Sequence, residues 1–194
     1  MFQIELKYKG NRTYLQGGDI FNALMESFLQ IGDGFISRLV LKSFAINQIK
    51  VLHKAPDRDK GILGNGLWKY TDGSEQRFWL QETEEPVTDS YSFNEDAITD
   101  EATLSGEAIL LEMQNEYTLI ENIIALTKRL NYLLSPDVRG KWLFGQIDLH
   151  RALPEYWKLI EIERKICVGN SFSRNIIQID GDVYGEIRFI GGEV

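Results

Sequence analysis

The sequence predicts an α+β protein made of two similar halves, each an antiparallel sheet wrapped around one central helix. Only two segments of the 194 residues have sustained helical periodicity, 14–31 and 116–134, and strand-like sequence surrounds both. Each helix is followed by long strand-like segments and then by a hairpin that turns on an Asp-Gly pair, at residues 72–73 and 180–181. A lone hydrophobic helix among strands has to bury its apolar face against a sheet.

The first helix is predicted within residues 14–31. Its apolar residues recur at the spacing of a single helical face: Phe21, Leu24, Met25 and Phe28. Gly17 and Gly18 are expected to interrupt the preceding segment, and Asp19 is expected to cap the first turn, where its charge suits the positive end of the helix. Glycines at 32 and 34 predict the end of the helix.

The remainder of the first half reads as strands and turns. Residues 2–8 predict a strand with a short return over 12–15, and residues 35–53 predict one long bent strand or two short ones interrupted near Asn47. Residues 57–66 predict a loop by composition. Residues 66–81 then predict the first hairpin.

The second half repeats this order of elements. Residues 102–113 predict a strand, and residues 116–134 predict a helix. Its buried stripe is expected to hold Ile120, Ile123, Ile124, Thr127, Leu130 and Leu134. Two strands broken at Leu153 and Pro154 follow, and then the second hairpin. The matched order, displaced by roughly one hundred residues, favours a duplication. The alternative is a single α+β domain whose halves look alike by chance.

The negative charge of the chain is confined to one segment. Residues 82–101 hold eight of the 29 acidic residues and no Lys or Arg, which leaves 21 acids against 21 bases elsewhere. This composition predicts a solvated acidic connector between a first repeat, 1–81, and a second repeat, 102–194. The alternative is an acidic docking surface for a basic partner. A net charge of -8 argues against nucleic-acid binding, which needs a basic surface.

Several classes of protein are excluded by simple counts. No apolar run is long enough to span a membrane, and the N-terminus lacks a secretion pattern, so a cytoplasmic location is expected. Cys167 is the only cysteine, and the two histidines have no metal-site spacing, so neither a disulfide nor a metal is expected. The GxSxG and GxxxxGK[ST] motifs are absent.

The element order resembles the hotdog fold in its double form. The second half resembles it through the break at Pro154, the last hairpin at residues 179–181 and the following residues 186–188, and the first half through GGDIFNALMESF and its own hairpin. The resemblance implies two hotdog-like repeats and a protein that processes acyl thioesters of coenzyme A or acyl carrier protein. That protein would be thioesterase-like or dehydratase-like and act in fatty acid or polyketide metabolism. The resemblance further implies no cofactor beyond the carrier, and a monomer or a homodimer.

In hotdog proteins the acyl chain lies between two units, and the start of a central helix polarises the thioester carbonyl. One of the two equivalent sites of a double hotdog is often lost. The amides of Gly17, Gly18 and Asp19 fit this role on physical grounds alone, because a helix start offers donors to a developing negative charge. Gln16 and Asn22 are candidates for additional side-chain donors.

Asp19, Glu26 and His150 are the candidate catalytic residues, and each has a structural alternative. Asp19 is more readily an N-cap than a catalyst, and its charge opposes an oxyanion at the same helix end. Glu26 lies two turns further along the same side, facing either a pocket or solvent. His150 shares a strand face with Asp148, either as an activated base or as a surface pair. His53 is expected to be a core histidine with its hydrogen bonds satisfied.

The sequence departs from the hotdog pattern just before each helix. Many hotdog dehydratases carry a histidine there, but residues 13–19 read TYLQGGD and residues 114–118 read QNEYT. A dehydratase that uses this histidine is therefore disfavoured. Two readings stay open: a thioester hydrolase that uses an acid near the helix, and a non-catalytic hotdog protein that binds an acyl group or a protein partner.

Overall fold

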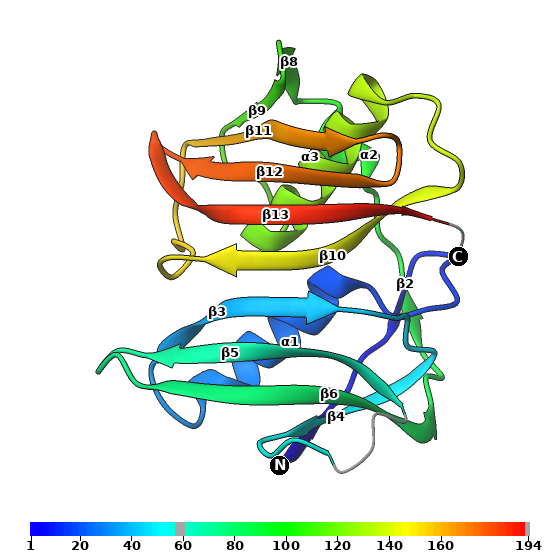
Figure 1. The fold of residues 1–194 in the computed structure, drawn as a ribbon, viewed down its shortest axis with the longest axis vertical. Helices are drawn as coiled ribbons and strands as arrows, with labels where there is room; N and C mark the ends of the chain where they lie inside the picture. The colour runs from blue at the N-terminus through cyan, green and yellow to red at the C-terminus, as the bar shows by residue number, and fades with distance from the viewer. Residues whose placement is uncertain (57–60, 193–194) are drawn as a thin grey trace. The chain divides into compact units, whose positions relative to one another are not determined.

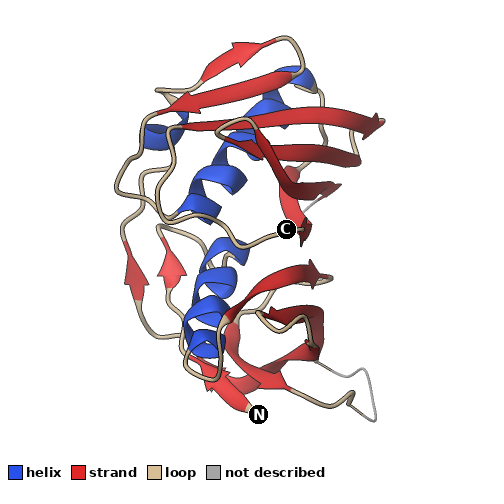
Figure 2. Cartoon of the chain, turned by 90° about the vertical axis from the view of Figure 1, so that its left-hand side faces the viewer, coloured by secondary structure: helices blue, strands red, loops and turns tan. Residues whose placement is uncertain are grey.

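The computed structural model describes residues 1–56 and 61–192. The chain divides into two compact units, Met1–Phe93 and Asn94–Val194. In each unit an antiparallel sheet packs against one long helix, as Figure 1 and Figure 2 show. The boundary between the units falls inside the acidic segment 82–101. Part of that segment is regular structure, because β6 (Glu75–Pro86) extends into it.

Among its described residues, 1–56 and 61–93, the first unit has five strands in its sheet. Their spatial order is β1 (Phe2–Ile4), β4 (Asn47–Leu52), β6, β5 (Ile62–Tyr70) and β3 (Gly34–Leu41), with antiparallel neighbours throughout. The helix α1 (Gly17–Leu29) contacts β1 and β3 and buries Ile20, Phe21, Leu24 and Phe28. A separate parallel pair joins β2 (Tyr8–Lys9) to β7 (Ser90–Tyr91).

Phe28 is the centre of an aromatic core in this unit. Its ring stacks on Trp68 at 5.0 Å between centroids, meets Phe78 also at 5.0 Å, and meets the edge of Phe2 at 5.4 Å. The helix therefore buries its apolar face against side chains that three strands supply, as its periodicity predicts.

The second unit has six strands in its sheet within residues 94–192, the part that the structure describes. Their order is β8 (Thr103–Ser105), β9 (Ala108–Glu112), β11 (Leu159–Val168), β12 (Phe172–Ile179), β13 (Asp182–Gly192) and β10 (Lys141–Leu149). The helix α3 (Leu119–Leu134) contacts β9, β10, β11 and β12, and the short helix α2 (Asp96–Thr99) packs on α3.

The two sheets differ in how their hairpins are inserted. In the first unit, the first hairpin strand, β5, lies beside β3, the strand that follows the helix. In the second unit, the second hairpin strand, β13, lies beside β10. The turn from β11 to β12 spans only residues 169–171, and these two strands are neighbours in the sheet. The corresponding strands of the first unit, β4 and β5, are joined by the longer segment 53–61 and are not neighbours, because β6 lies between them. The matched order along the sequence therefore does not extend to an identical chain path.

Several sequence predictions need correction. Residues 12–15 form no strand, because the backbone of β2 pairs with β7 instead. The region 35–53 is two strands, but the break is at 42–46, and Asn47 begins β4. Of the predicted loop 57–66, residues 57–60 lie outside the described residues, and β5 begins at Ile62. The predicted strand 102–113 is a hairpin that turns at Gly106, whose φ is 60°.

Candidate functional site

The start of α1 differs from the prediction by three residues. Gln16, in an extended conformation, is the N-cap residue, and its side chain makes no capping hydrogen bond. Gly17 and Gly18 are the first two helical residues rather than a break before the helix. Asp19 is the third helical residue and does not cap the helix, because its carboxylate binds side chains outside the helix.

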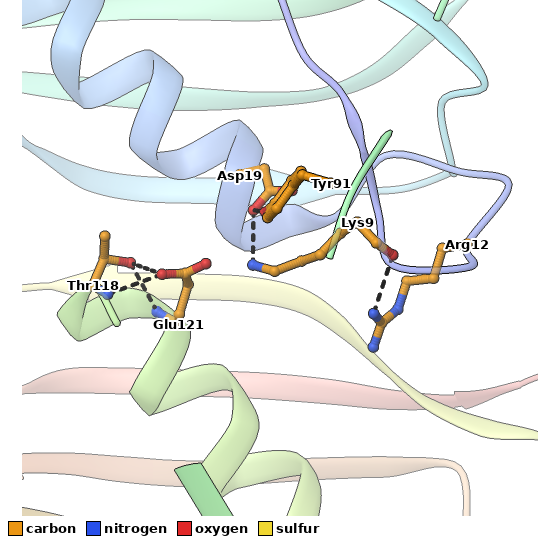
Figure 3. Close-up of polar contacts among 6 residues, drawn as sticks. All are labelled: Lys9, Arg12, Asp19, Tyr91, Thr118 and Glu121. Carbon is orange, nitrogen blue, oxygen red and sulfur yellow. Dashed lines mark hydrogen bonds and ion pairs between the residues drawn. The ribbon is translucent and has the colours of Figure 1, made fainter. Parts of the chain in front are cut away.

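Lys9 and Tyr91 hold the Asp19 carboxylate. The Lys9 ammonium lies 2.9 Å from Oδ1, and the Tyr91 hydroxyl lies 2.9 Å from Oδ1 and 3.0 Å from Oδ2 (Figure 3). The β2–β7 pair places Lys9 directly opposite Tyr91. The ammonium also lies 3.9 Å from the centre of the Phe93 ring, a favourable cation–π distance. Sequence reasoning missed both partners, which lie 10 and 72 residues from Asp19.

This ion pair changes the electrostatics of the helix start. The side chains of Lys9 and Asp19 are only 5% and 11% exposed, so each charge needs the other. With Lys9 beside it, Asp19 no longer presents an uncompensated negative charge to a ligand at this helix end. The amides of Gly17, Gly18 and Asp19 have no partners within the helix, since the first amides of any helix lack them.

Gln16, the N-cap residue, carries a further donor in its side chain. Its Nε2 atom is buried and has no hydrogen-bond partner among the residues that the structure describes. Asn22, one turn into the helix, is half-buried. The predicted grouping of Gln16, Gly17 and Gly18 at one helix end is therefore present.

The start of α3 is closed by its own side chains. Thr118 accepts a hydrogen bond from the Glu121 amide, and Glu121 accepts one from the Thr118 amide, which is a capping box (Figure 3). The fully buried Asn122 exchanges two hydrogen bonds with Asn115, at 2.7 and 3.0 Å. The sequence contained the signal for this box in the spacing of Thr118 and Glu121. Of the two long helices, only α1 starts without a side-chain cap.

The remaining candidates are an exposed residue further along α1 and an exposed residue of the second unit. Glu26 is exposed, and Asp19 precedes it by seven residues, about 10 Å along the helix. His150 is exposed and follows β10 in the second unit, whereas Asp19 belongs to the first unit. Asp148 has Gln146 and Arg188 as neighbours, with Arg188 at 3.8 Å. No group of three or more metal-ligating side chains is found in the described residues.

His53 is half-buried rather than part of the core, and its hydrogen bonding is incomplete. Its ring stacks on Phe28 at 6.0 Å and meets Phe2 edge-on at 5.7 Å. Its Nε2 atom is buried, with no partner among residues 1–56 and 61–192, so the expectation of a satisfied histidine is wrong. Burial lowers the pKa of His53 below its ordinary value of 6.5, and the positive N-terminus lowers it further.

Comparison with solved structures decides the fold. The pyran synthase domain from module nine of the sorangicin pathway is similar over 95% of this chain and 90% of its own, with a TM-score of 0.52 and 9% identity. The chain has the hotdog fold. The identity is too low for the hotdog likeness to carry chemistry from one protein to the other.

Two further hotdog domains resemble the chain more weakly. A monomeric dehydratase domain from a trans AT polyketide synthase split module matches 98% of this chain and 97% of its own, at 10% identity and a TM-score of 0.46. The erythromycin dehydratase matches 98% of this chain and 84% of its own, also at 10% identity and a TM-score of 0.46. No family model matches the sequence, and no curated protein sequence does. Within the described residues, no helix is long and apolar enough to cross a membrane.

Proposed function

We propose that this protein binds acyl thioesters of coenzyme A or acyl carrier protein, with the thioester carbonyl at the start of α1. The observation that carries this proposal is a helix start with two glycines and no side-chain cap, where Lys9 neutralises the only acidic residue of the first turn. The hotdog fold adds support, because a pyran synthase domain of a biosynthetic pathway is built on a similar chain.

The geometry suits an oxygen atom that gains negative charge. The carbonyl oxygen accepts hydrogen bonds from the amides of Gly17 and Gly18, and Gln16 Nε2 is the side-chain donor. The helix dipole adds to this stabilisation, as it does at other anion-binding helix starts. Asn22 lies one turn beyond and contacts the acyl part rather than the carbonyl.

Asp19 is the acid or base of the catalytic version of this proposal. Its Oδ2 has a hydrogen bond only from Tyr91 among those that the structure gives, at 3.0 Å, so a substrate or a water can replace the hydroxyl there. Gln16 occupies the place where many hotdog dehydratases have a histidine, which favours hydrolysis over dehydration by that route. Glu26 and His150 are both exposed, and Glu26 also lies about 10 Å along the helix from Asp19, so neither is preferred.

A non-catalytic acyl-binding protein is the second candidate. Both oxygens of Asp19 are engaged by Lys9 and Tyr91, which is the arrangement of a structural carboxylate as much as of a base. In this version the helix start binds the thioester, or the acyl group of a carrier partner, without turnover.

We further propose that the halves are two hotdog-like repeats, of which the second has lost its helix-start site. The capping box of α3 supports this, because the Thr118 and Glu121 amides already bind side chains and the Glu121 carboxylate puts a negative charge at that helix start. The repeats keep the limits 1–81 and 102–194, joined by the acidic connector. The carrier of the acyl group is then substrate, and no further cofactor is required.

A paired binding and turnover assay tests the proposal. Thermal shift and hydrolysis are measured with a panel of acyl-coenzyme A and acyl-carrier-protein thioesters, for wild type, Gln16→Ser and Asp19→Asn. Serine is a better N-cap than glutamine, so Gln16→Ser keeps the helix while it removes the amide donor. We expect it to weaken thioester binding about tenfold, the loss of one well-placed hydrogen bond.

Thr118→Ser is the control, because it preserves a cap on the helix without the proposed site. Stabilisation by thioesters without turnover supports the binding version, and turnover abolished by Asp19→Asn supports the enzyme. If no thioester stabilises the wild type and none is turned over, both versions are wrong.

A further inference from the structure

A short strap of chain holds the Asp19 carboxylate from outside the helix. The strap is residues 88–92, which contain β7 and lie between the end of β6 and the start of the second unit. Two backbone hydrogen bonds join it to the β2 region. The Tyr8 amide donates to the Asp89 carbonyl at 2.9 Å, and the Gly10 amide donates to the Tyr91 carbonyl at 2.7 Å.

The strap contacts Asp19 through the Tyr91 hydroxyl. This hydroxyl lies 2.9 Å from Oδ1 and 3.0 Å from Oδ2 of the carboxylate (Figure 3). The Asp19 side chain is only 11% exposed. A substrate that needs a carboxylate oxygen of Asp19 therefore has to displace the Tyr91 hydroxyl. For the proposed function, on which this inference rests, the contact is autoinhibitory.

The strap is weakly attached compared with the strand beside it. All of its residues are exposed, whereas Val87 just before it is 8% exposed and Phe93 just after it is half-buried. Separation of the strap from β2 therefore exposes little apolar surface and breaks polar contacts that water can replace. The ion pair of Lys7 with Asp89 adds little to the attachment, because both side chains are well exposed.

Lys9 stays beside Asp19 when the strap moves, because it belongs to β2 and is 4% exposed. Its ammonium lies 2.9 Å from Asp19 Oδ1 and 3.9 Å from the centre of the Phe93 ring, beyond the strap. We propose that the 88–92 strap is a gate over Asp19. In the closed form Tyr91 blocks the carboxylate, and separation of β7 from β2 frees Oδ2 for a thioester substrate while Lys9 still neutralises the charge.

Tyr91→Phe tests the gate, because it keeps the ring and removes the hydroxyl that binds Asp19. Loss of a hydrogen bond to a charged group should raise the open fraction of the strap about tenfold. Tyr8→Phe is the matched control. It removes a hydroxyl from the opposite strand of the same pair, where that hydroxyl donates to the Ile46 carbonyl at 2.6 Å and not to Asp19.

Two measurements on the protein without ligand follow the opening. The Tyr8 and Gly10 amides donate to the strap, so we expect their hydrogen exchange to be about tenfold faster in Tyr91→Phe and close to the wild type in Tyr8→Phe. Labelling of carboxylates with a water-soluble carbodiimide and an amine measures access to Asp19, with the exposed Asp72 as reference. The ratio of Asp19 to Asp72 labelling should rise in Tyr91→Phe. Unchanged exchange or unchanged labelling overturns the proposal.

Titration with acyl-coenzyme A separates the gate from the proposed function. If only the open form binds, the apparent dissociation constant falls as the open fraction rises, so Tyr91→Phe should bind about tenfold more tightly than the wild type. Equal affinities of the two proteins overturn the gate and leave the helix-start site standing. If neither protein binds a thioester although exchange and labelling increase, the proposed function is wrong and the gate over Asp19 is supported.

Discussion

At the residue scale, the decisive contact is the ion pair between Lys9 and Asp19. Removal of one partner of a buried pair leaves an uncompensated charge, which costs about 3–5 kcal/mol. We expect Lys9→Met to lower the free energy of unfolding by that amount, since both side chains are almost fully buried. Lys9→Met combined with Asp19→Asn should cost clearly less than the two single changes together. Urea unfolding of the four proteins measures this coupling, and additive effects would contradict it.

His53 makes the stability of the protein depend on pH. Burial lowers the pKa of the folded-state imidazole below 6.5, so the folded protein takes up the proton less readily than the unfolded chain does. As the pH falls through 6.5, the unfolded chain gains the proton first, and stability is lost. Replacement by Phe keeps the ring against Phe28 and removes the titration.

We therefore expect His53→Phe to lose less stability than the wild type between about pH 7.5 and 5.5. Urea unfolding at both pH values gives the comparison. His150→Gln is the control, because His150 is exposed, and it should behave like the wild type. An equal pH dependence in His53→Phe and in the wild type would show that His53 does not contribute.

At the element scale, the cap of α3 is the clearest single contribution. Thr118→Ala removes the side chain that accepts from the Glu121 amide and should destabilise the protein by about 1 kcal/mol. Thr118→Ser retains the hydroxyl and should stay close to the wild type. Chemical denaturation measures the free energy of unfolding of both variants. If Thr118→Ala unfolds with the same free energy as the wild type, solvent replaces the cap without cost.

The approach of β5 to β3 depends on a residue without a side chain. A Cβ atom on Gly64 would lie 2.0 Å from the Val40 carbonyl oxygen, and backbone cannot yield as a flexible side chain does. We expect Gly64→Ala to destabilise the protein by about 3 kcal/mol. Gly192→Ala is the control, because its Cβ would only touch Leu143 at 3.8 Å, and it should change stability little. Thermal denaturation of both variants tests the difference.

Local sequence patterns predicted the helices and hairpins well. They did not predict the strand order of the sheets or the partners of Asp19, which depend on residues far apart in the sequence. The helices α1 and α3 and both hairpins follow from periodicity and from the Asp-Gly turns, which few neighbouring residues determine. The sheet order depends on which hairpin strand meets β3 or β10, and no short pattern reports that. The site shows the same division: Gln16, Gly17 and Gly18 are adjacent in sequence, whereas Tyr91 reaches Asp19 across 72 residues.

At the scale of the whole molecule, charge bears on the proposed ligand. The chain has a net charge of -8, and coenzyme A carries negatively charged phosphates. Their mutual repulsion reaches about 30 Å at 10 mM salt but only about 8 Å at 150 mM. If the helix start of α1 binds acyl-coenzyme A, binding should therefore tighten several-fold as salt increases over this range. A site built on basic residues would show the opposite salt dependence, with binding that weakens as salt increases.

The matching acyl-pantetheine thioester without phosphates is the control, because its binding has no charge to screen. Calorimetric titration of both ligands at the two salt concentrations separates the effect of the carrier from that of the thioester. If the dissociation constant for acyl-coenzyme A instead rises with salt, attraction between the phosphates and nearby basic side chains outweighs repulsion by the net charge of the chain. Equal salt dependence for both ligands would instead trace the effect to the acyl chain, since salt also strengthens apolar burial.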